Sequence, residues 1–209
     1  MRKFPLILPS FLVFIVWLTY ELKKNEKKNK EGLQAFLKTE EEANNTRKQD
    51  ISHLNYVLFS LSTLPEYTGE DTEILTQQKR LLFFEGKQML NLSAYSNTEL
   101  KLMYGAANLE FLSTADVNFI NFSRELFKYG QLLYEKGAEE QALAVLEYGI
   151  HIGTDLSKHY ALLVDIYVKN QQLDKLLLLK ENAENIHTLM KDSIVSNLEA
   201  QITLLEAMS

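Results

Sequence analysis

The sequence predicts an all-α protein, for three reasons. No proline interrupts residues 66–209, and because proline breaks helix interiors, so long a stretch without one favours helices. Residues 123–183 repeat a hydrophobic pattern at a spacing of 34 residues, which fits two short amphipathic helices. Near the N-terminus, an uncharged apolar run has the composition of a membrane helix. With 209 residues, 46% of them hydrophobic, the chain can bury a core.

Charge is distributed unevenly along the chain. Up to Lys30 there are seven Lys and Arg against two acids, whereas the rest holds 15 Lys and Arg against 26 Asp and Glu. An acidic body repels a phosphate backbone, so no nucleic acid is expected among its partners. Cysteine is absent, which excludes disulfides, thiolate metal sites and a cysteine nucleophile and leaves the compartment open.

The uncharged run extends from Phe4 to Tyr20 and follows two basic residues. Its length is at the lower limit for a membrane span, about 17 residues, and Trp17 and Tyr20 are typical of a membrane interface. We therefore predict a retained single-pass anchor in the cell membrane over residues 1–22. A cleaved signal is disfavoured by bulky residues where a peptidase needs small ones. A buried soluble helix would need protein to cover every face.

Five lysines lie between residues 23 and 30. By the positive-inside rule they would hold the body in the cytoplasm. An exported, signal-anchored protein also begins with a short basic tail and an apolar run, so the side of the membrane stays open. The lysines are interpreted either as contacts to anionic lipid headgroups or as a solvated linker.

The next elements are assigned from periodicity. We predict a helix over residues 31–49, with Gly32 as a hinge between this helix and the anchor. Alternating apolar and polar residues predict an extended segment near 54–64, and Pro65 begins a loop that ends at Asp71. Three helices are expected after it. The first covers residues 72–90. The second is capped by Ser96 and Glu99 and includes Phe111, and the third is capped by Asp116 and continues to Gly137.

The repeated helix pairs follow. Gly137 separates the two helices of the first pair, and the small Ala142 allows close packing in its second helix. A second pair begins at Thr154. The final helix is expected to cap the array with one apolar stripe. That stripe consists of Ile194, Leu198, Ile202 and Leu205. The predicted division is 1–22 membrane anchor, 23–49 basic linker and acidic helix, 50–115 extended segment and non-repeat helices, and 116–209 helical repeats with the capping helix.

The repeats resemble the tetratricopeptide family. The first copy has Leu126, Tyr129, Gly130, Leu133, Ala142 and Leu146, and the second has Tyr160, Leu163, Val164, Tyr167, Leu176 and Lys180 at the matching positions. In the first copy Gly137 also occupies one of the family's small-residue positions. The resemblance implies an α-solenoid over 116–209, whereas Leu176 and Lys180 depart from the family's alanine and aromatic residue. The whole layout also resembles a group of bacterial membrane-anchored repeat proteins. A generic helical bundle is the alternative architecture.

No catalytic constellation is apparent, so neither an enzyme nor a cofactor is expected. Phosphate-binding, dinucleotide-binding and serine-hydrolase motifs are absent, and no histidine pair has the spacing of a helical zinc site. His151 and His159 lie near one predicted loop, and their convergence would be the basis of an enzymatic alternative. Surface or capping histidines are the commoner case.

Binding of another protein is the function that the resemblance implies. In tetratricopeptide proteins the first helices of successive repeats line a concave groove for a peptide or helix. The matching residues here are Arg124, Phe127, Gln131, Tyr134, Lys158, Ala161, Asp165 and Val168. We therefore expect a membrane-anchored scaffold that binds a protein or peptide. A helical sensor with a small-molecule pocket between residues 50–115 and the repeats is the second hypothesis.

Overall fold

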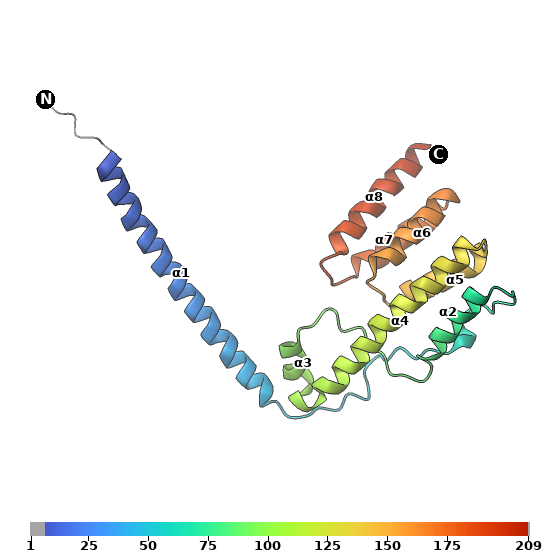
Figure 1. Cartoon of the computed structure of the whole chain (residues 1–209), viewed down its shortest axis with the longest axis horizontal. Helices are drawn as coiled ribbons and strands as arrows, with labels where there is room; N and C mark the ends of the chain where they lie inside the picture. Colours follow the sequence, from blue (N-terminus) through green and yellow to red (C-terminus); the bar gives the residue numbers. More distant parts are fainter. Residues whose placement is uncertain (1–6, 209) are drawn as a thin grey trace. The chain divides into compact units, whose positions relative to one another are not determined.

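The computed structural model describes residues 7–208, and within them it contains eight α-helices and no β-strand, so the protein is all-α (Figure 1). By its contacts the chain divides into two compact units. One unit comprises residues 1–49 and 97–107, and the other comprises residues 50–96 and 108–209. Each unit is described separately.

The first unit is built on α1 (Ile7–Asn44), which continues through Gly32. The predicted hinge at Gly32 is therefore wrong. The helix persists because this region is rich in Lys and Glu, which form helices well. Opposite charges also pair one turn apart, with Lys30 Nζ 2.9 Å from Glu26.

Helix α3 (Asn97–Tyr104) packs on the C-terminal end of α1 and begins one residue after the predicted cap. Ala43 and Leu100 are buried there. The Glu40 carboxylate accepts a hydrogen bond from the Thr98 hydroxyl at 2.7 Å and pairs with Lys101. The hydrogen bond from Lys101 has the largest effect, and together with the one from Thr98 it lowers the pKa of the Glu40 carboxyl.

Gly105 ends α3 with a φ of +88°. A Cβ at this position would lie 2.5 Å from the Arg47 carbonyl oxygen, so only glycine fits.

Among residues 7–208, none of the helices combines the length and apolarity that a membrane span requires. Residues 1–6 of the predicted anchor lie outside the described part of the chain.

The second unit begins with irregular chain. Of the predicted extended segment 54–64, one residue pairs in β fashion: the Val57 N–H donates to the Met89 carbonyl at 2.8 Å. The segment then enters a short 3-10 helix at Leu61–Thr63. Its extension is thus only partial, because no neighbouring strand continues the ladder among the described residues.

Helix α2 (Thr72–Leu82) is capped by Asp71, whose carboxylate accepts the Glu73 N–H at 2.9 Å. It ends eight residues before the predicted limit, Leu90, and Gly86, with a φ of +73°, lies in the turn that follows.

Helix α4 (Leu109–Glu135) differs most from the expectation. It follows a 3-10 turn at Ala106–Asn108 and runs without interruption past Asp116. The predicted boundary at Asp116 is therefore wrong. Its carboxylate does not cap α4 but accepts the Leu92 N–H at 3.0 Å, and so fixes a neighbouring loop.

Four further helices follow α4 with short turns between them: α5 (Glu139–His151), α6 (Ser157–Lys169), α7 (Leu173–Glu184) and α8 (Lys191–Met208). The predicted break at Gly137 is confirmed, with a φ of +83°. Gly130 of α4 lies against Leu146 of α5, where an added Cβ would lie 2.9 Å from the leucine side chain. Gly130 thus allows the close approach of α4 and α5. Ala142, to which the sequence assigned this role, is fully buried in the core.

Side-chain contacts fix how these helices stack. Glu139 bonds Lys169, Glu147 bonds Tyr167, and Gly149 lies against His159, so α5 and α6 are antiparallel. The predicted stripe of α8 is buried, at 0 to 7% exposure, and covers the end of the core. Its Glu199 pairs with Lys180 of α7 at 2.8 Å.

Candidate functional site

A concavity of about 350 Å³ lies between α4 and α6. Six of the eight residues that the sequence assigned to a groove line it, and Arg124 and Val168 do not. The six are Phe127, Gln131 and Tyr134 from α4, and Lys158, Ala161 and Asp165 from α6. Glu135 and Leu162 also line it, and we call these eight residues the α4/α6 groove. Arg124 lies outside this lining and is exposed on α4, one turn before Phe127.

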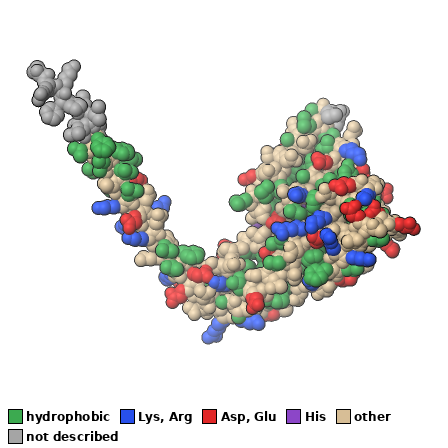
Figure 2. Space-filling view, viewed as in Figure 1, with side chains coloured by type: hydrophobic (Ala, Val, Ile, Leu, Met, Phe, Trp, Pro, Cys, Tyr) green, Lys and Arg blue, Asp and Glu red, His purple; other side chains and the backbone are tan. Residues whose placement is uncertain are grey.

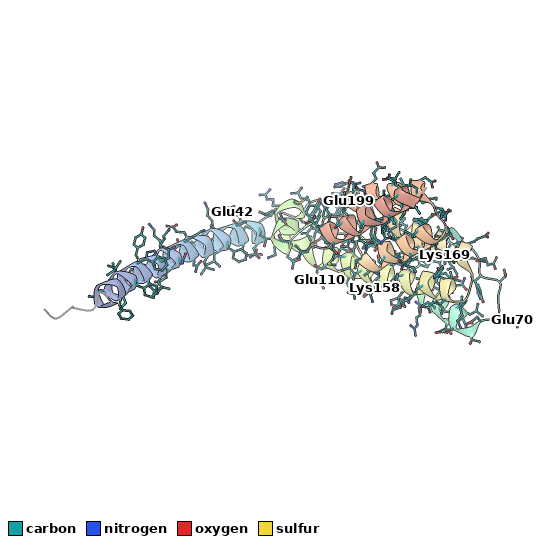
Figure 3. All side chains as sticks on the ribbon, turned by 90° about the horizontal axis from the view of Figure 1, so that it is seen from above. Glu42, Glu70, Glu110, Lys158, Lys169 and Glu199 are labelled. Carbon is teal, nitrogen blue, oxygen red and sulfur yellow. The ribbon has the colours of Figure 1, made fainter. Side chains whose placement is uncertain are left out.

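The two walls of the groove run in the same direction. The Phe127 ring meets the His159 ring with centroids 5.4 Å apart, and farther along both helices the Lys169 ammonium lies 5.4 Å from the centre of the Tyr134 ring. Because the contacts follow the same order in both helices, α4 and α6 are parallel. Lys158 and Lys169 lie near the two ends of α6 (Figure 3).

Apolar side chains form the floor of the groove. Phe127, Tyr134 and Leu162 are half-buried and pack against the core that α5 to α8 share. Phe127 and Tyr134 remain partly exposed to solvent. Such a floor can take an apolar side chain of a ligand.

Charged groups lie at both ends of the groove. Within residues 7–208, Arg124, Lys158 and Asp165 form no ion pair. Glu135 accepts a hydrogen bond from the Gln131 amide at 2.8 Å. By contrast, Lys169 is held by Glu139 at 2.8 Å. The groove thus offers both cations and carboxylates to a ligand.

His159 lies directly behind the groove and is fully buried. A Cβ on Gly149 would lie 2.6 Å from its Nε2 atom, and neither ring nitrogen has a hydrogen-bond partner among the described residues. Burial lowers the pKa of His159 to about 3, so the imidazole is neutral near pH 7. The histidine therefore acts here as part of the core.

The structure gives His151 and His159 different environments, since His151 is exposed at the end of α5. The expectation that a histidine lies at the surface or caps a helix is wrong for His159, which is buried and whose ring nitrogens have no hydrogen-bond partner among the described residues. The sequence holds one signal of its burial, which is the absence of a side chain at Gly149. The groove residue Glu135 was also missed, although it lies one turn after Gln131 on the same helix.

A second concavity, of about 390 Å³, lies between the loop around Asn91 and the ends of α5, α6 and α7. The Asn91 amide donates to the Gly153 carbonyl at 2.6 Å and so ties this loop to the repeats. Polar and ionisable side chains of its lining are Asn91, Ser93, Tyr95, His151, Thr154, Asp155, Tyr160, Asn182, Asn185 and His187. Burial and the nearby Asp155 raise the pKa of Tyr160 to about 12.

No cluster of three or more His, Asp or Glu side chains that could hold a metal ion is found in the described part of the chain. Comparisons with protein-family models, curated proteins and solved structures found no match to this sequence.

Proposed function

We propose that this protein is a membrane-anchored helical-repeat scaffold whose α4/α6 groove binds a peptide segment of another protein, without catalysis. The observation that carries the proposal is the α4/α6 groove itself. Its aromatic floor, amide and unpaired charges are the groups that recognise peptides.

A tetratricopeptide-like solenoid is the architecture that we propose for α4 to α8. Its support is the parallel stacking of alternate helices. Helices α5 and α7 are also parallel to each other. Glu147 of α5 pairs with Lys175 of α7 at 3.1 Å, and farther along the two helices Ile150 and Asn182 line one concavity. Stacked helix pairs of this kind present their first helices on one face.

The membrane anchor is supported by the exposed apolar surface of α1. The side chains from Phe11 to Trp17 are all exposed, with Val13 at 69% and Trp17 at 56%. Figure 2 shows these hydrophobic side chains gathered at the N-terminal part of α1. So many neighbouring apolar side chains are costly in water, and insertion into lipid would remove that cost.

Charge reversal tests the groove. In the double variant Arg124→Glu/Lys158→Glu we expect the full chain, solubilised from its native membrane, to capture its partner severalfold less well. Both side chains are exposed and form no ion pair with any residue from 7 to 208, so the fold should be retained. The matched control Lys48→Glu/Lys79→Glu makes the same change in net charge at two exposed lysines that do not line the groove. Equal capture by both double variants would contradict the groove assignment.

A helical sensor that binds a small molecule is the second candidate function, and the polar concavity beside Asn91 favours it. This concavity lies where the hypothesis places a pocket, between the non-repeat segment and the repeats. A thermal-shift screen of polar metabolites tests the idea. A stabilising compound whose effect is lost in His151→Ala would support it, and the absence of any stabilising compound would count against it.

A further inference from the structure

We infer that the α4/α6 groove selects its peptide by charge order, with an acidic side chain at the Lys158 end, an apolar side chain over the aromatic floor and a basic side chain at the Asp165 end. This inference rests on the proposed peptide-binding function and adds the chemistry of the bound segment.

The order follows from the parallel helices. Because α4 and α6 run in the same direction, Arg124 and Lys158 lie toward the N-terminal end of the groove, and Glu135 and Asp165 lie toward the other end. The groove is therefore bipolar. A peptide with the opposite charges in the same order would place each charge beside an opposite one.

The helix termini favour the same order. Lys158 is the second residue of α6, and Glu135 is the last residue of α4. The N-terminus of a helix carries partial positive charge and the C-terminus partial negative charge. An acidic ligand group near Lys158 and a basic one near Glu135 thus gain from both the side chains and the helix ends.

These charges are available to a ligand. Lys158 and Asp165 form no ion pair in the described structure, and both are exposed. Neighbouring cations are already engaged: Lys169 pairs with Glu139 at 2.8 Å, and Lys128 pairs with Glu125 at 2.6 Å. Charge selection should therefore depend on Lys158 and Asp165.

The spacing of the charges sets the spacing in the peptide. Lys158 and Asp165 are seven residues apart on α6, which corresponds to about 10 Å at about 1.5 Å per residue. Arg124 and Glu135 are separated by about 16 Å on the same basis. An extended peptide advances about 3.3 Å per residue. Its acidic and basic residues should therefore lie about three to five positions apart, with an apolar residue between them.

A random heptapeptide display library, selected on the full chain in lipid nanodiscs, tests this inference. We expect the wild-type chain to enrich peptides with this pattern. Lys158→Glu should favour peptides with a second basic residue in place of the acidic one. Asp165→Lys should favour peptides with a second acidic residue in place of the basic one. For a defined wild-type peptide, each variant should bind about fivefold more weakly, as for the loss of an exposed ion pair of about 1 kcal/mol. Lys79→Glu is the control and should leave the selection unchanged.

The outcomes separate the two levels of the proposal. Enriched peptides without paired charges, or the same peptides from all variants, would overturn the charge order and leave peptide binding intact. Preferential binding of a second copy of this chain in the groove would overturn the assignment of a foreign segment. If no peptide is enriched by any form of the chain, peptide binding fails and the inference fails with it.

Discussion

The ring of Phe127, on the floor of the groove, meets the ring of the buried His159 edge to face, with centroids 5.4 Å apart and planes at 65°. Gly149 of α5 lies against the same imidazole. Helices α4, α5 and α6 therefore meet at His159, and the position of the groove floor depends on close packing behind it.

The close packing of α5 predicts that Gly149→Ala destabilises the protein. The new Cβ would lie 2.6 Å from His159 Nε2, so the ring and Phe127 must shift. We expect a loss of about 1–3 kcal/mol in the free energy of unfolding, measured by urea denaturation. Gly32→Ala is the matched helical control, because no atom lies within 4 Å of that Cβ. Equal stability of the two variants would show that α5 and α6 do not pack this closely.

His159 predicts a specific pH dependence of stability. Its pKa is about 3 in the folded state, below the ordinary value of 6.5, so the unfolded chain binds one more proton between these values. Stability from this group is complete above pH 6.5 and falls as the pH decreases, by up to about 1.4 kcal/mol per pH unit. Urea denaturation at pH 7.5 and pH 5 measures the slope.

The His159→Leu variant should lose this contribution, so its stability should fall less steeply between pH 7.5 and pH 5 than that of the wild type. The exposed His151 provides the control, and His151→Gln should keep the wild-type slope. A His159→Leu slope equal to the wild-type slope would mean that His159 is protonated in the folded protein.

The ion pair between Glu40 and Lys101 predicts local order in the first unit. Lys101→Met should increase amide hydrogen exchange in α3, because the hydrogen bonds to Glu40 and Asn44 are lost. Since these bonds lower the pKa of Glu40 below 4.5, acid should have the same effect as the carboxylate becomes protonated. The control Lys38→Met removes an exposed ion pair to Glu42, whose atoms are 4.0 Å apart, and should leave hydrogen exchange in α3 unchanged. Unaltered exchange in Lys101→Met would remove this role for the pair.

The apolar part of α1 predicts membrane attachment. The full chain should remain in the membrane pellet after alkaline carbonate extraction, and deletion of residues 1–22 should release it. Replacing Leu33, Phe36 and Leu37 by serine is the control, because these exposed residues lie on the same helix beyond the lysines. Recovery of the full chain in the soluble fraction would contradict the anchor.

A single cysteine reports the side of the membrane, because the chain has none of its own. Asn185→Cys places the thiol on an exposed residue. Labelling of intact cells by an impermeant thiol reagent would place the body outside and direct the partner search to envelope proteins. Protection until lysis would place the body in the cytoplasm, as the lysine cluster favours.

The sequence pattern was sufficient to predict those helices that bury a single face. The stripe of α8 follows from apolar residues at helical spacing, and the break between α4 and α5 follows from Gly137. The resemblance to tetratricopeptide repeats assigned Phe127 and Ala161 to one groove, and the structure brings them to one concavity. Local pattern suffices there because each helix has a single buried stripe.

The remaining features depend on contacts that are distant in sequence. Asp116 has the residue type of a helix cap, but its carboxylate is used by Leu92, so α4 continues through it. His159 is polar by type, yet the space left by Gly149 admits its ring into the core. Gly32 can hinge a chain, but the neighbouring charged residues keep α1 helical.

Site-specific photocrosslinking tests directly whether the α4/α6 groove binds a peptide. A single cysteine carrying a benzophenone is placed at Ala161 in the groove, or at Ala200, an exposed alanine of α8. In native membranes we expect the Ala161 probe to crosslink a defined protein and the Ala200 probe not to do so. The Arg124→Glu/Lys158→Glu change should abolish the Ala161 product. Equal crosslinking from the two positions, or a product unaffected by the charge reversal, would show that the groove does not bind the partner.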